Sequence, residues 1–395
     1  MELKLDAKKW RRHRGMAKLL DAIGGDVGET RYVGGAVRDG LLGLTVNDVD
    51  FATRLRPDEV VERLQAAGLK AVPTGIEHGT ITAVSDGHPY EITTLRRDVE
   101  TFGRHATVAF TDDWKEDAAR RDFTINALMA DPVTGEIFDY FGGLPDLEQR
   151  HVRFIGDPFE RIAEDHLRIL RFFRFHARFG QGAPDAAALD ACTARANDLM
   201  ALSRERIADE LSKLLSVADP VATVRIMLDR GILKPVIPEI EASAWGQLEA
   251  LVRAEAEAGL PSDPLRRLSA LLPRDPQLAG AIAARLKLSN RARKRIGCAA
   301  GAEISDPKAI AYRNGVECAV DRLLLAGHAS RAAEIAAWTP PRLPIAGGAL
   351  IKRGLTEGPV VSRTLRAIEE RWIAGGFPTG AAFDAIVADA LQNAR

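Results

Sequence analysis

The strongest constraint on the fold is a change of residue pattern near position 155 of the 395-residue chain. Before it, short β-prone runs such as RYVGG, HGTITAVS and PYEITTL are mostly separated by Gly, Pro or Asp. After it, apolar residues recur at helical spacing, with Pro and Gly breaks near positions 261, 273, 340 and 378. The pattern predicts an α+β chain, in which a head with a mixed sheet precedes a long all-helical extension.

The charge balance and the cysteines constrain the cellular compartment of the protein but not its function. Lys and Arg number 54 and Asp and Glu number 55, so the net charge neither requires nor excludes a nucleic-acid partner. Cys192, Cys298 and Cys318 form no C-x-x-C pair, so we expect neither a disulfide framework nor a zinc site, and we expect a reducing compartment. Without a signal peptide or an apolar run of roughly 18 residues, we expect a cytoplasmic protein and no membrane partner.

A possible phosphate site lies in the stretch RYVGGAVRDGLLGLTVNDVDFAT, residues 31–53. An apolar run leads into Gly34 and Gly35, and a helical pattern follows them. Glycine allows close approach of the backbone to a ligand, and a helix N-terminus offers free N–H groups to a phosphate. Arg38, in the first turn of that helix, would add a fork of donors. These features predict a phosphate-binding turn.

Two carboxylates follow in the same stretch. Asp48 and Asp50 are one residue apart in the predicted strand NDVDFAT, so their side chains would share one face. Two carboxylates at one place repel each other unless a cation lies between them, and hard oxygen ligands suit Mg²⁺. Taken singly, a glycine pair usually marks a turn and a D-x-D is often solvated. Together they predict a nucleotidyl-transfer site in which metal ions activate a hydroxyl and neutralise pyrophosphate.

The combination resembles the signature of the polymerase-β-like nucleotidyltransferase superfamily. The longer string GGAVRDGLLG…NDVDFAT resembles its class II branch, which holds tRNA CCA-adding enzymes and bacterial poly(A) polymerases. The resemblance implies a nucleotidyltransferase head at 1–150, a helical neck at 151–225 that recognises the base, a helical body at 226–330 and a helical tail at 331–395 that contacts tRNA. In the tail, Ala349 stands where many relatives have an aspartate.

A second motif, RRDFTINALMAD, ends at residue 131. Family members contact the sugar and phosphates of the incoming nucleotide here, which implies these roles for Arg121 and Asp122. Arg121 is a permanent cation suited to a triphosphate, and Asp122 can accept a hydrogen bond from a ribose hydroxyl. By itself, the segment would equally fit an N-capped helix with a salt-bridged surface.

The segment EDHLRILRFFRF predicts a helix on which Asp165 and Arg168 are neighbours and Arg171 and Arg174 continue the row. An ordinary helix would use this spacing for a surface ion pair worth under about 1 kcal/mol. The resemblance implies instead that E-D-x-x-R selects the nucleotide. Cytosine and adenine each present an amino donor beside a ring-nitrogen acceptor, whereas guanine and uracil present the reverse, so an Asp–Arg pair would accept CTP and ATP. Arg171 and Arg174 would assist base or phosphate binding.

Three further features are less specific. Glu91 is either a third active-site carboxylate or a solvated strand residue, and residues 96–114 resemble a mobile loop of CCA-adding enzymes. The segment RLKLSNRARKRIG, residues 285–297, is either an RNA-binding patch or a solvated face. Its cations are Arg285, Lys287, Arg291, Arg293, Lys294 and Arg295.

We therefore predict template-independent addition of CCA to tRNA 3′ ends, with CTP and ATP as substrates, tRNA as partner, Mg²⁺ as cofactor and no protein partner inferred. A poly(A) polymerase of the same branch is the first alternative, although such relatives carry a basic stretch where this chain has VPTGIEHGTITAV. Addition of CC only or of A only also remains open. A non-catalytic RNA-binding protein would not need paired carboxylates, and a small-molecule nucleotidyltransferase would not need the helical extension.

Overall fold

The structure is a computed structural model that describes residues 5–13, 15–46, 48–102, 105–302 and 304–394. Its contacts divide the chain into two compact units, residues 1–238 and 239–395. The first unit holds the sheet and the helices around the candidate site. The second is helical throughout its described residues. Each unit is described by itself.

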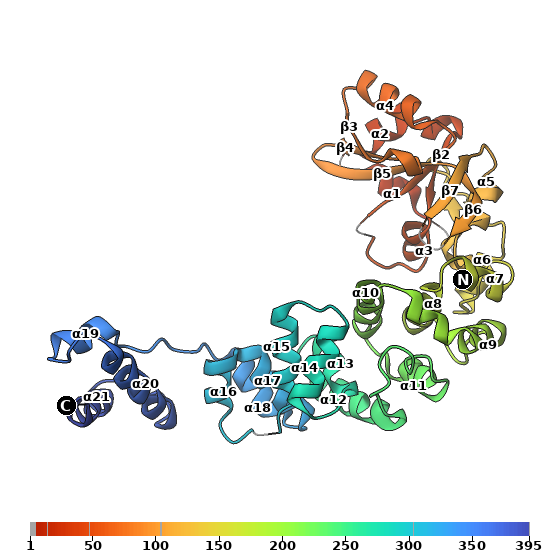
Figure 1. The fold of residues 1–395 in the computed structure, drawn as a ribbon. Helices are drawn as coiled ribbons and strands as arrows, with labels where there is room; N and C mark the ends of the chain where they lie inside the picture. The colour runs from red at the N-terminus through yellow and green to blue at the C-terminus, as the bar shows by residue number, and fades with distance from the viewer. Residues whose placement is uncertain (1–4, 14, 47, 103–104, 303, 395) are drawn as a thin grey trace. The chain divides into compact units, whose positions relative to one another are not determined.

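Strands from the described part of the first unit form a seven-stranded mixed sheet in the order β3-β4-β5-β2-β1-β8-β9 (Figure 1). The parallel pair is β2 with β5, and the other neighbours are antiparallel. The expected mixed sheet is confirmed. The strands are β1 Thr30–Val33, β2 Phe51–Thr53, β3 Lys70–Gly75, β4 Thr80–Ser85, β5 His88–Thr94, β8 Met129–Ala130 and β9 Ile137–Phe138.

The core of the sheet follows from alternation along its strands. Tyr32, Phe51, Ile81 and Ile92 are fully buried, while their neighbours along each strand face the other side. The helices of this part are α1 Ala7–Arg11, α2 Met16–Ala22, α3 Gly35–Leu41, α4 Pro57–Ala66, α5 Trp114–Ala119 and α6 Gly143–Glu148.

The stretch that resembles a mobile loop contains regular structure. Strands β6 (Arg96–Phe102) and β7 (His105–Phe110) pair as an antiparallel ribbon. Residues 103 and 104 between them lie outside the described part. The β-branched and aromatic residues on both sides of the gap favour such pairing.

Five helices of the first unit follow the sheet: α7 Pro158–Glu164, α8 Arg168–Phe179, α9 Ala186–Ala194, α10 Arg204–Leu215 and α11 Val221–Asp229. Helix α8 buries an aromatic row that meets Phe123 and Phe154 of the preceding region. The Phe123 ring centroid lies 4.9 Å from that of Phe154 and 5.1 Å from that of Phe175. Aromatic packing thereby fixes α8 against the sheet-bearing part of this unit.

One helix begins later than its pattern predicts. Asp165 is extended, with φ of −149°, and α8 begins at Arg168. The Asp165 carboxylate accepts a hydrogen bond from the Leu167 N–H at 3.1 Å. Such a local bond competes with helical pairing. The expectation that Asp165 and Arg168 lie on one helix is therefore wrong, although the chain reversal keeps them close.

The second unit comprises α12 Trp245–Glu257, α13 Pro264–Leu271, α14 Pro276–Arg285, α15 Asn290–Ala299, α16 Pro307–Asn314, α17 Val316–Leu325, α18 Ala329–Ala337, α19 Gly347–Lys352, α20 Pro359–Ala374 and α21 Ala381–Asn393. Three of these helices begin at an Asp-Pro pair, with Asp263, Asp275 and Asp306 as N-caps. Each aspartate accepts from backbone N–H groups, and proline fits the first helical position. The sequence thus encodes these starts locally.

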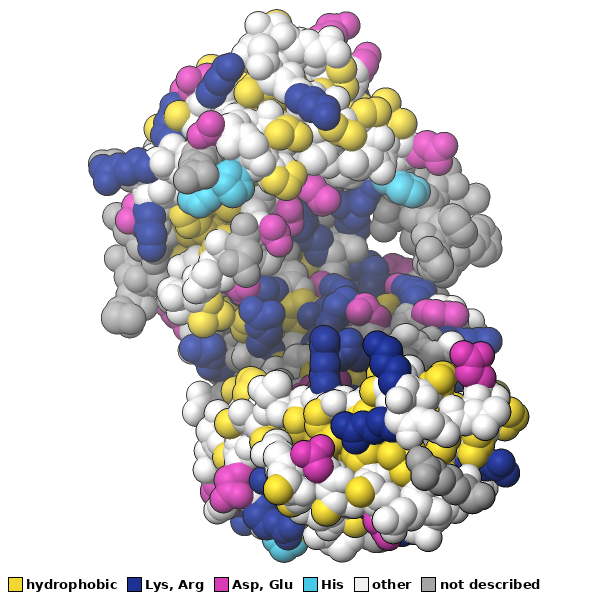
Figure 2. Space-filling view, turned by 90° about the vertical axis from the view of Figure 1, so that its left-hand side faces the viewer, with side chains coloured by type: hydrophobic (Ala, Val, Ile, Leu, Met, Phe, Trp, Pro, Cys, Tyr) yellow, Lys and Arg dark blue, Asp and Glu magenta, His cyan; other side chains and the backbone are white. Residues whose placement is uncertain are grey.

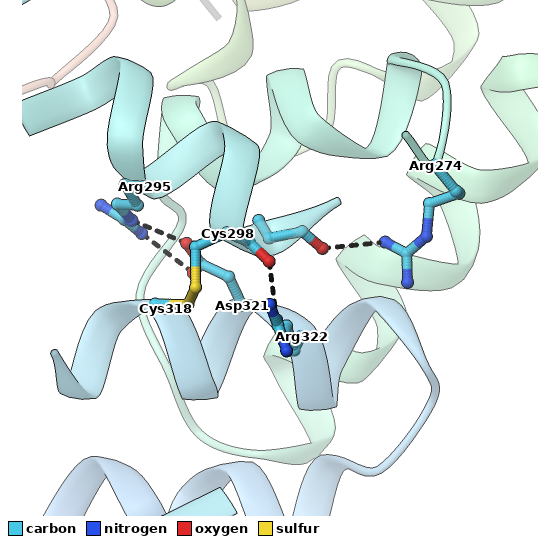
Figure 3. The surroundings of a disulfide bond; sticks show 7 residues. Arg274, Arg295, Cys298, Cys318, Asp321 and Arg322 are labelled. Carbon is cyan, nitrogen blue, oxygen red and sulfur yellow. Dashed lines mark hydrogen bonds and ion pairs between the residues drawn. A yellow bond between two sulfur atoms is a disulfide. The ribbon is translucent and has the colours of Figure 1, made fainter. Parts of the chain in front are cut away.

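Helices α15 and α17 are joined by a disulfide between Cys298 and Cys318, whose Cα atoms are 6.0 Å apart (Figure 3). Beside it, Arg322 donates to the Cys298 carbonyl at 2.6 Å and Arg295 donates to Asp321 at 2.6 Å. The expectation of no disulfide is wrong for this pair, because packing of α15 on α17 brings the two cysteines together across a separation of 20 residues. Cys192 is buried and free.

None of the helices in the described residues combines the length and apolar character that crossing a membrane requires.

Candidate active site

The glycine turn between β1 and α3 is tightly constrained. Gly34 has φ of 68° and ψ of −130°, a conformation that side chains rarely adopt. A Cβ at this position would lie 2.9 Å from Nη1 of Arg121. The absence of a side chain therefore lets the Arg121 guanidinium lie directly against the turn.

Backbone pairing brings one acidic residue, Asp50, to this turn and a second, Glu91, beside it. The Val33 N–H donates to the Asp50 carbonyl at 3.1 Å. In the parallel pair β2–β5, Phe51 lies opposite Ile92, so Asp50 and Glu91 each precede one of these two paired residues. Phe51 and Ile92 are fully buried, which directs Asp50 and Glu91 toward the other face.

The two aspartates of the D-x-D motif lie in the connection before β2 rather than in a strand. β2 begins only at Phe51, because β1 ends at the glycine turn: Val33 still bonds to the Asp50 carbonyl, but β1 has no residue left to pair with Asp48. The predicted strand for Asp48 and Asp50 is therefore wrong. Asp48 is exposed and Asp50 is half-buried.

The charges of these carboxylates interact. Burial raises the pKa of Asp50, the negative charges of Glu91 and Asp48 raise it further, and Arg121 opposes them. Within the described residues, no group of three or more His, Cys, Asp and Glu side chains is placed to hold one metal ion in common. The oxygen donors themselves fit a hard divalent cation, whose charge would relieve the repulsion.

A pocket of about 580 Å³ opens beside the turn. Nine predicted residues line it: Gly34, Gly35, Arg38, Arg121, Asp122, Asp165, Arg168, Arg171 and Arg174. Five residues that sequence reasoning missed join them: Arg120, Asn126, Leu167, Phe175 and Arg206. Among these described residues, seven arginines face two aspartates, which makes the pocket suitable for a polyanion such as a triphosphate. On the face of the molecule that Figure 2 shows, basic side chains (dark blue) and acidic side chains (magenta) are intermixed.

Asp122 is the buried anchor of the pocket wall. Its carboxylate accepts from Nε of Arg171 at 2.8 Å, from Nδ2 of Asn126 at 2.9 Å and from the Phe123 N–H at 2.9 Å. Burial alone would raise the pKa of Asp122, but Arg171 and these hydrogen bonds lower it, so the group stays ionised. Arg38 donates to the Asn126 side-chain oxygen and thereby extends the network to α3.

Arg120 and Arg121 are held in position by contacts to their side chains and to their backbone. Nε of Arg120 and Nη2 of Arg121 donate to the buried Asp117 carboxylate at 3.0 and 3.1 Å. Arg161 of α7, itself buried, donates to the carbonyl oxygens of both residues. These contacts fix the backbone of the RRD motif, so its guanidinium groups are preorganised for an anion.

Asp165 and Arg168 both face the pocket but bind different partners. Oδ2 of Asp165 accepts from Nη2 of Arg206 at 2.7 Å. Nη1 of Arg168 donates to the Arg161 carbonyl at 2.8 Å and to Glu164. Further along α8, Nε of Arg174 donates to Glu210 at 2.6 Å. An acceptor, Asp165, and a donor, Arg168, are therefore both held in fixed orientations in the pocket wall.

The predicted RNA-binding patch lies in the second unit and is partly engaged in ion pairs. Arg285 pairs with Glu239, Arg291 pairs with Glu317 and Arg295 pairs with Asp321. By contrast, Arg293 and Lys294 line a groove of about 660 Å³ between α14 and α15. Lys287 follows α14 with a positive φ of 58°.

Sequence reasoning missed Arg206 because no local motif marks it. It comes about forty residues after Asp165 in the segment SRERIADEL, where its spacing predicts only an ordinary helix. Asn126, by contrast, lies within the RRDFTIN motif and is four residues after Asp122, to which it donates. A partner inside the same short motif can be picked out from the sequence, whereas a partner on a distant helix cannot.

Comparison with known families identifies two regions of the chain. Residues 30–153 match the family described as "Poly A polymerase head domain", and residues 184–243 match "Probable RNA and SrmB- binding site of polymerase A".

Full-length relatives are similar over most of the chain. CCA tRNA nucleotidyltransferase 1, mitochondrial, of Mus musculus is 34% identical over 383 residues, which cover 92% of this chain and 87% of that protein. The CCA-adding enzyme of Lacticaseibacillus paracasei is 31% identical over 374 residues, covering 89% of each. The crystal structure of the Bacillus stearothermophilus CCA-adding enzyme in complex with CTP superposes with a TM-score of 0.71 at 27% identity, over 92% of this chain and 93% of that one. The chain therefore belongs to the family of CCA-adding tRNA nucleotidyltransferases.

Proposed function

We propose that this chain adds CCA to the 3′ ends of tRNA, using CTP and ATP and no nucleic-acid template. The observation that carries the proposal is the arginine-lined pocket beside the glycine turn, which has Asp165 and Arg168 in its wall. Asp50 is bonded to the strand that leads into the same turn, and Glu91 lies beside Asp50 on the next strand. A site with a polyanion cradle, adjacent carboxylates and an acceptor–donor pair fits nucleotidyl transfer with base selection.

The carboxylates are proposed as the metal site. Asp48 and Asp50 would hold Mg²⁺, and Glu91 is proposed as a third carboxylate of the reaction centre. Bound divalent ions in such sites lower the pKa of an attacking hydroxyl and neutralise the leaving pyrophosphate. The Val33–Asp50 hydrogen bond and the β2–β5 register support this proposal, because they put Asp50 and Glu91 at neighbouring positions on adjacent strands.

The arginines are proposed to bind the nucleotide's charged groups. Arg38 and Arg121, with the backbone at Gly34 and Gly35, would hold the triphosphate, because they line one pocket and their charge does not titrate. Asp122 would accept a hydrogen bond from the ribose, since its lowered pKa keeps it ionised; the hydroxyl would take the place of one of the donors that now bind its two oxygens.

Base selection is assigned to Asp165 and Arg168. The carboxylate would accept from the exocyclic amino group of cytosine or adenine, and the guanidinium would donate to the ring nitrogen. A uracil or guanine would leave buried groups unpaired, which is the stronger form of discrimination. Arg171 and Arg174 would support the base and the phosphates from the next turn of α8.

The division into head, neck, body and tail at 150, 225 and 330 stays a prediction, as does a cytoplasmic location. Vertebrate relatives carry the word mitochondrial in their names. Comparing the location of tagged protein in cell fractions would test the second point.

The proposed activity is tested with purified protein, tRNA that lacks its 3′ CCA, and each labelled nucleotide alone and in pairs. We expect incorporation of C with CTP alone, and of A only after both C residues are present. Long A tails would support the poly(A) polymerase alternative. Binding of tRNA without any incorporation would support an RNA-binding protein. Products that stop at CC would identify the narrower variant.

A further inference from the structure

We propose that Arg206 is a specificity-determining positioning residue, which fixes the Asp165 carboxylate in the orientation that selects the base. This inference rests on the proposed function, because it assigns Arg206 a part in the recognition of CTP and ATP. Arg206 belongs to α10, whereas Asp165 ends α7, so the two come from separate elements.

The contacts of Asp165 hold both of its oxygens. Oδ1 accepts from the Leu167 N–H at 3.1 Å, and Oδ2 accepts from Nη2 of Arg206 at 2.7 Å. The Asp165 and Arg206 side chains are both 23% exposed and both line the pocket. A carboxylate has about four acceptor positions, so each oxygen keeps the capacity to accept from a ligand. Two donors from different directions define the plane of the carboxylate.

The position of Arg206 is itself fixed by the packing of α10. Ile207 and Leu211 of α10 are buried, and the helix packs on α8. One turn after Arg206, on the same face, the buried Glu210 accepts from Arg174 at 2.6 Å. The polar face of α10 therefore holds two pocket-lining residues, Asp165 through Arg206 and Arg174 through Glu210.

Removal of Arg206 would leave Asp165 with one donor, the Leu167 N–H. The carboxylate could then rotate about its side-chain torsions. It could still accept from the amino group of cytosine, but it could also turn away from the carbonyl oxygen of uracil. Discrimination between cytosine and uracil depends on an acceptor that cannot move away, so selectivity would fall while the phosphate-binding arginines stay in place. If Arg206 bound phosphate directly instead, every nucleotide would lose affinity equally.

The decisive variant is Arg206→Met, which keeps the aliphatic stem and removes the donors. On tRNA lacking CCA, we expect the ratio of kcat/KM for CTP to that for UTP to fall at least about tenfold. Arg206→Lys retains a donor and should recover most of the ratio. Arg230→Met is the matched control, since it removes a surface ion pair with Asp190 outside the pocket.

The route through Asp165 is tested by a double variant. Asp165→Ala alone should relax base choice, and adding Arg206→Met to it should change the ratio no further. An equal loss for CTP and UTP, or effects that add in the double variant, would overturn the inference. If Arg206→Met does not fold, as judged by thermal unfolding, Arg206→Leu, which also lacks donors, takes its place, and Arg206→Lys remains the rescue.

Failure of the proposed function gives a different result. An unmodified protein that incorporates no nucleotide, or takes UTP as readily as CTP, would refute the function itself. The inference alone would be refuted if the unmodified protein prefers CTP and ATP over UTP and the Arg206→Met variant shows the same preference.

Discussion

At the scale of single residues, the site depends on arginines that other residues hold in position and that still line the pocket. Asp117 anchors Arg120 and Arg121, and Arg161 binds the carbonyl oxygens of the same two arginines. Rigid side chains lose little entropy when a ligand binds, which favours both affinity and orientation. The carboxylates at the glycine turn repel one another, which favours a cation between them.

The first prediction concerns those carboxylates. Asp48→Asn and Asp50→Asn should each reduce incorporation of every nucleotide at least about a thousandfold, because the amide is a poor metal ligand while the pocket for the triphosphate is unchanged. Primer extension measures the loss, and calorimetric titration with CTP should give affinity close to that of the unmodified protein. Asp112→Asn, at an exposed position, is the control. Substantial activity in Asp50→Asn would contradict the assignment.

The second prediction concerns the close approach at Gly34. Gly34→Ala places a Cβ 2.9 Å from the Arg121 guanidinium and should lower kcat/KM for CTP by about a hundredfold, because small displacements of positioning groups are costly. Gly43→Ala is the control for the positive φ alone: Gly43 also has φ of 68°, but a Cβ there meets no atom within 4 Å. Equal losses in the two variants would show that backbone strain, rather than displacement of Arg121, causes the effect.

At the scale of elements, contacts between helices determine parts of the site that the local sequence pattern does not predict. The periodicity of EDHLRILRFFRF predicts one helix, but the Asp165 side chain bonds to the Leu167 N–H and the helix begins at Arg168. The four residues of the predicted row, Asp165, Arg168, Arg171 and Arg174, nevertheless all line the pocket. Arg206 was not predictable, since its importance arises only when α10 packs on α8.

The third prediction concerns the link between α15 and α17. Opening the Cys298–Cys318 disulfide, by reduction or in a Cys298→Ala/Cys318→Ala variant, should lower the free energy of unfolding by about 3 kcal/mol, as expected for a loop of about twenty residues. Denaturant titrations with and without reductant measure the difference.

Thiol labelling provides the control for that experiment. Unfolded without reductant, the protein should expose one reactive thiol, that of Cys192, and three after reduction. The double variant should not respond to reductant at all. Three reactive thiols before reduction would contradict the bond.

At the scale of the whole molecule, near-neutral net charge coexists with strong local charge. The motifs around Gly34, Asp50 and Arg121 could be predicted because each is a short contiguous stretch whose residue types suit phosphate or metal binding. The sheet order, the disulfide and the partners of the basic segment could not, because they depend on residues far apart in the chain. In that segment, Arg295 forms part of an ion-pair network with Asp321, which the charge pattern alone cannot reveal.

The fourth prediction therefore concentrates on the two cations of the α14–α15 groove. Arg293→Ala/Lys294→Ala should weaken tRNA binding and reduce the slope of log affinity against log salt by about 1 to 2, as expected for the loss of one or two phosphate contacts. Filter binding over a salt series measures the slope. Arg253→Ala, which removes an exposed ion pair with Glu249, is the control, and an unchanged slope in the double variant would place RNA elsewhere.

Every cation that the described residues contribute to the pocket wall is an arginine. A guanidinium keeps its proton at any pH at which the protein is folded. The attraction of this wall for a nucleotide therefore stays constant as conditions become alkaline, and lysine acetylation finds no target in it. Control of such a site has to come from the supply of nucleotide and metal, or from the RNA, rather than from neutralisation of the wall itself.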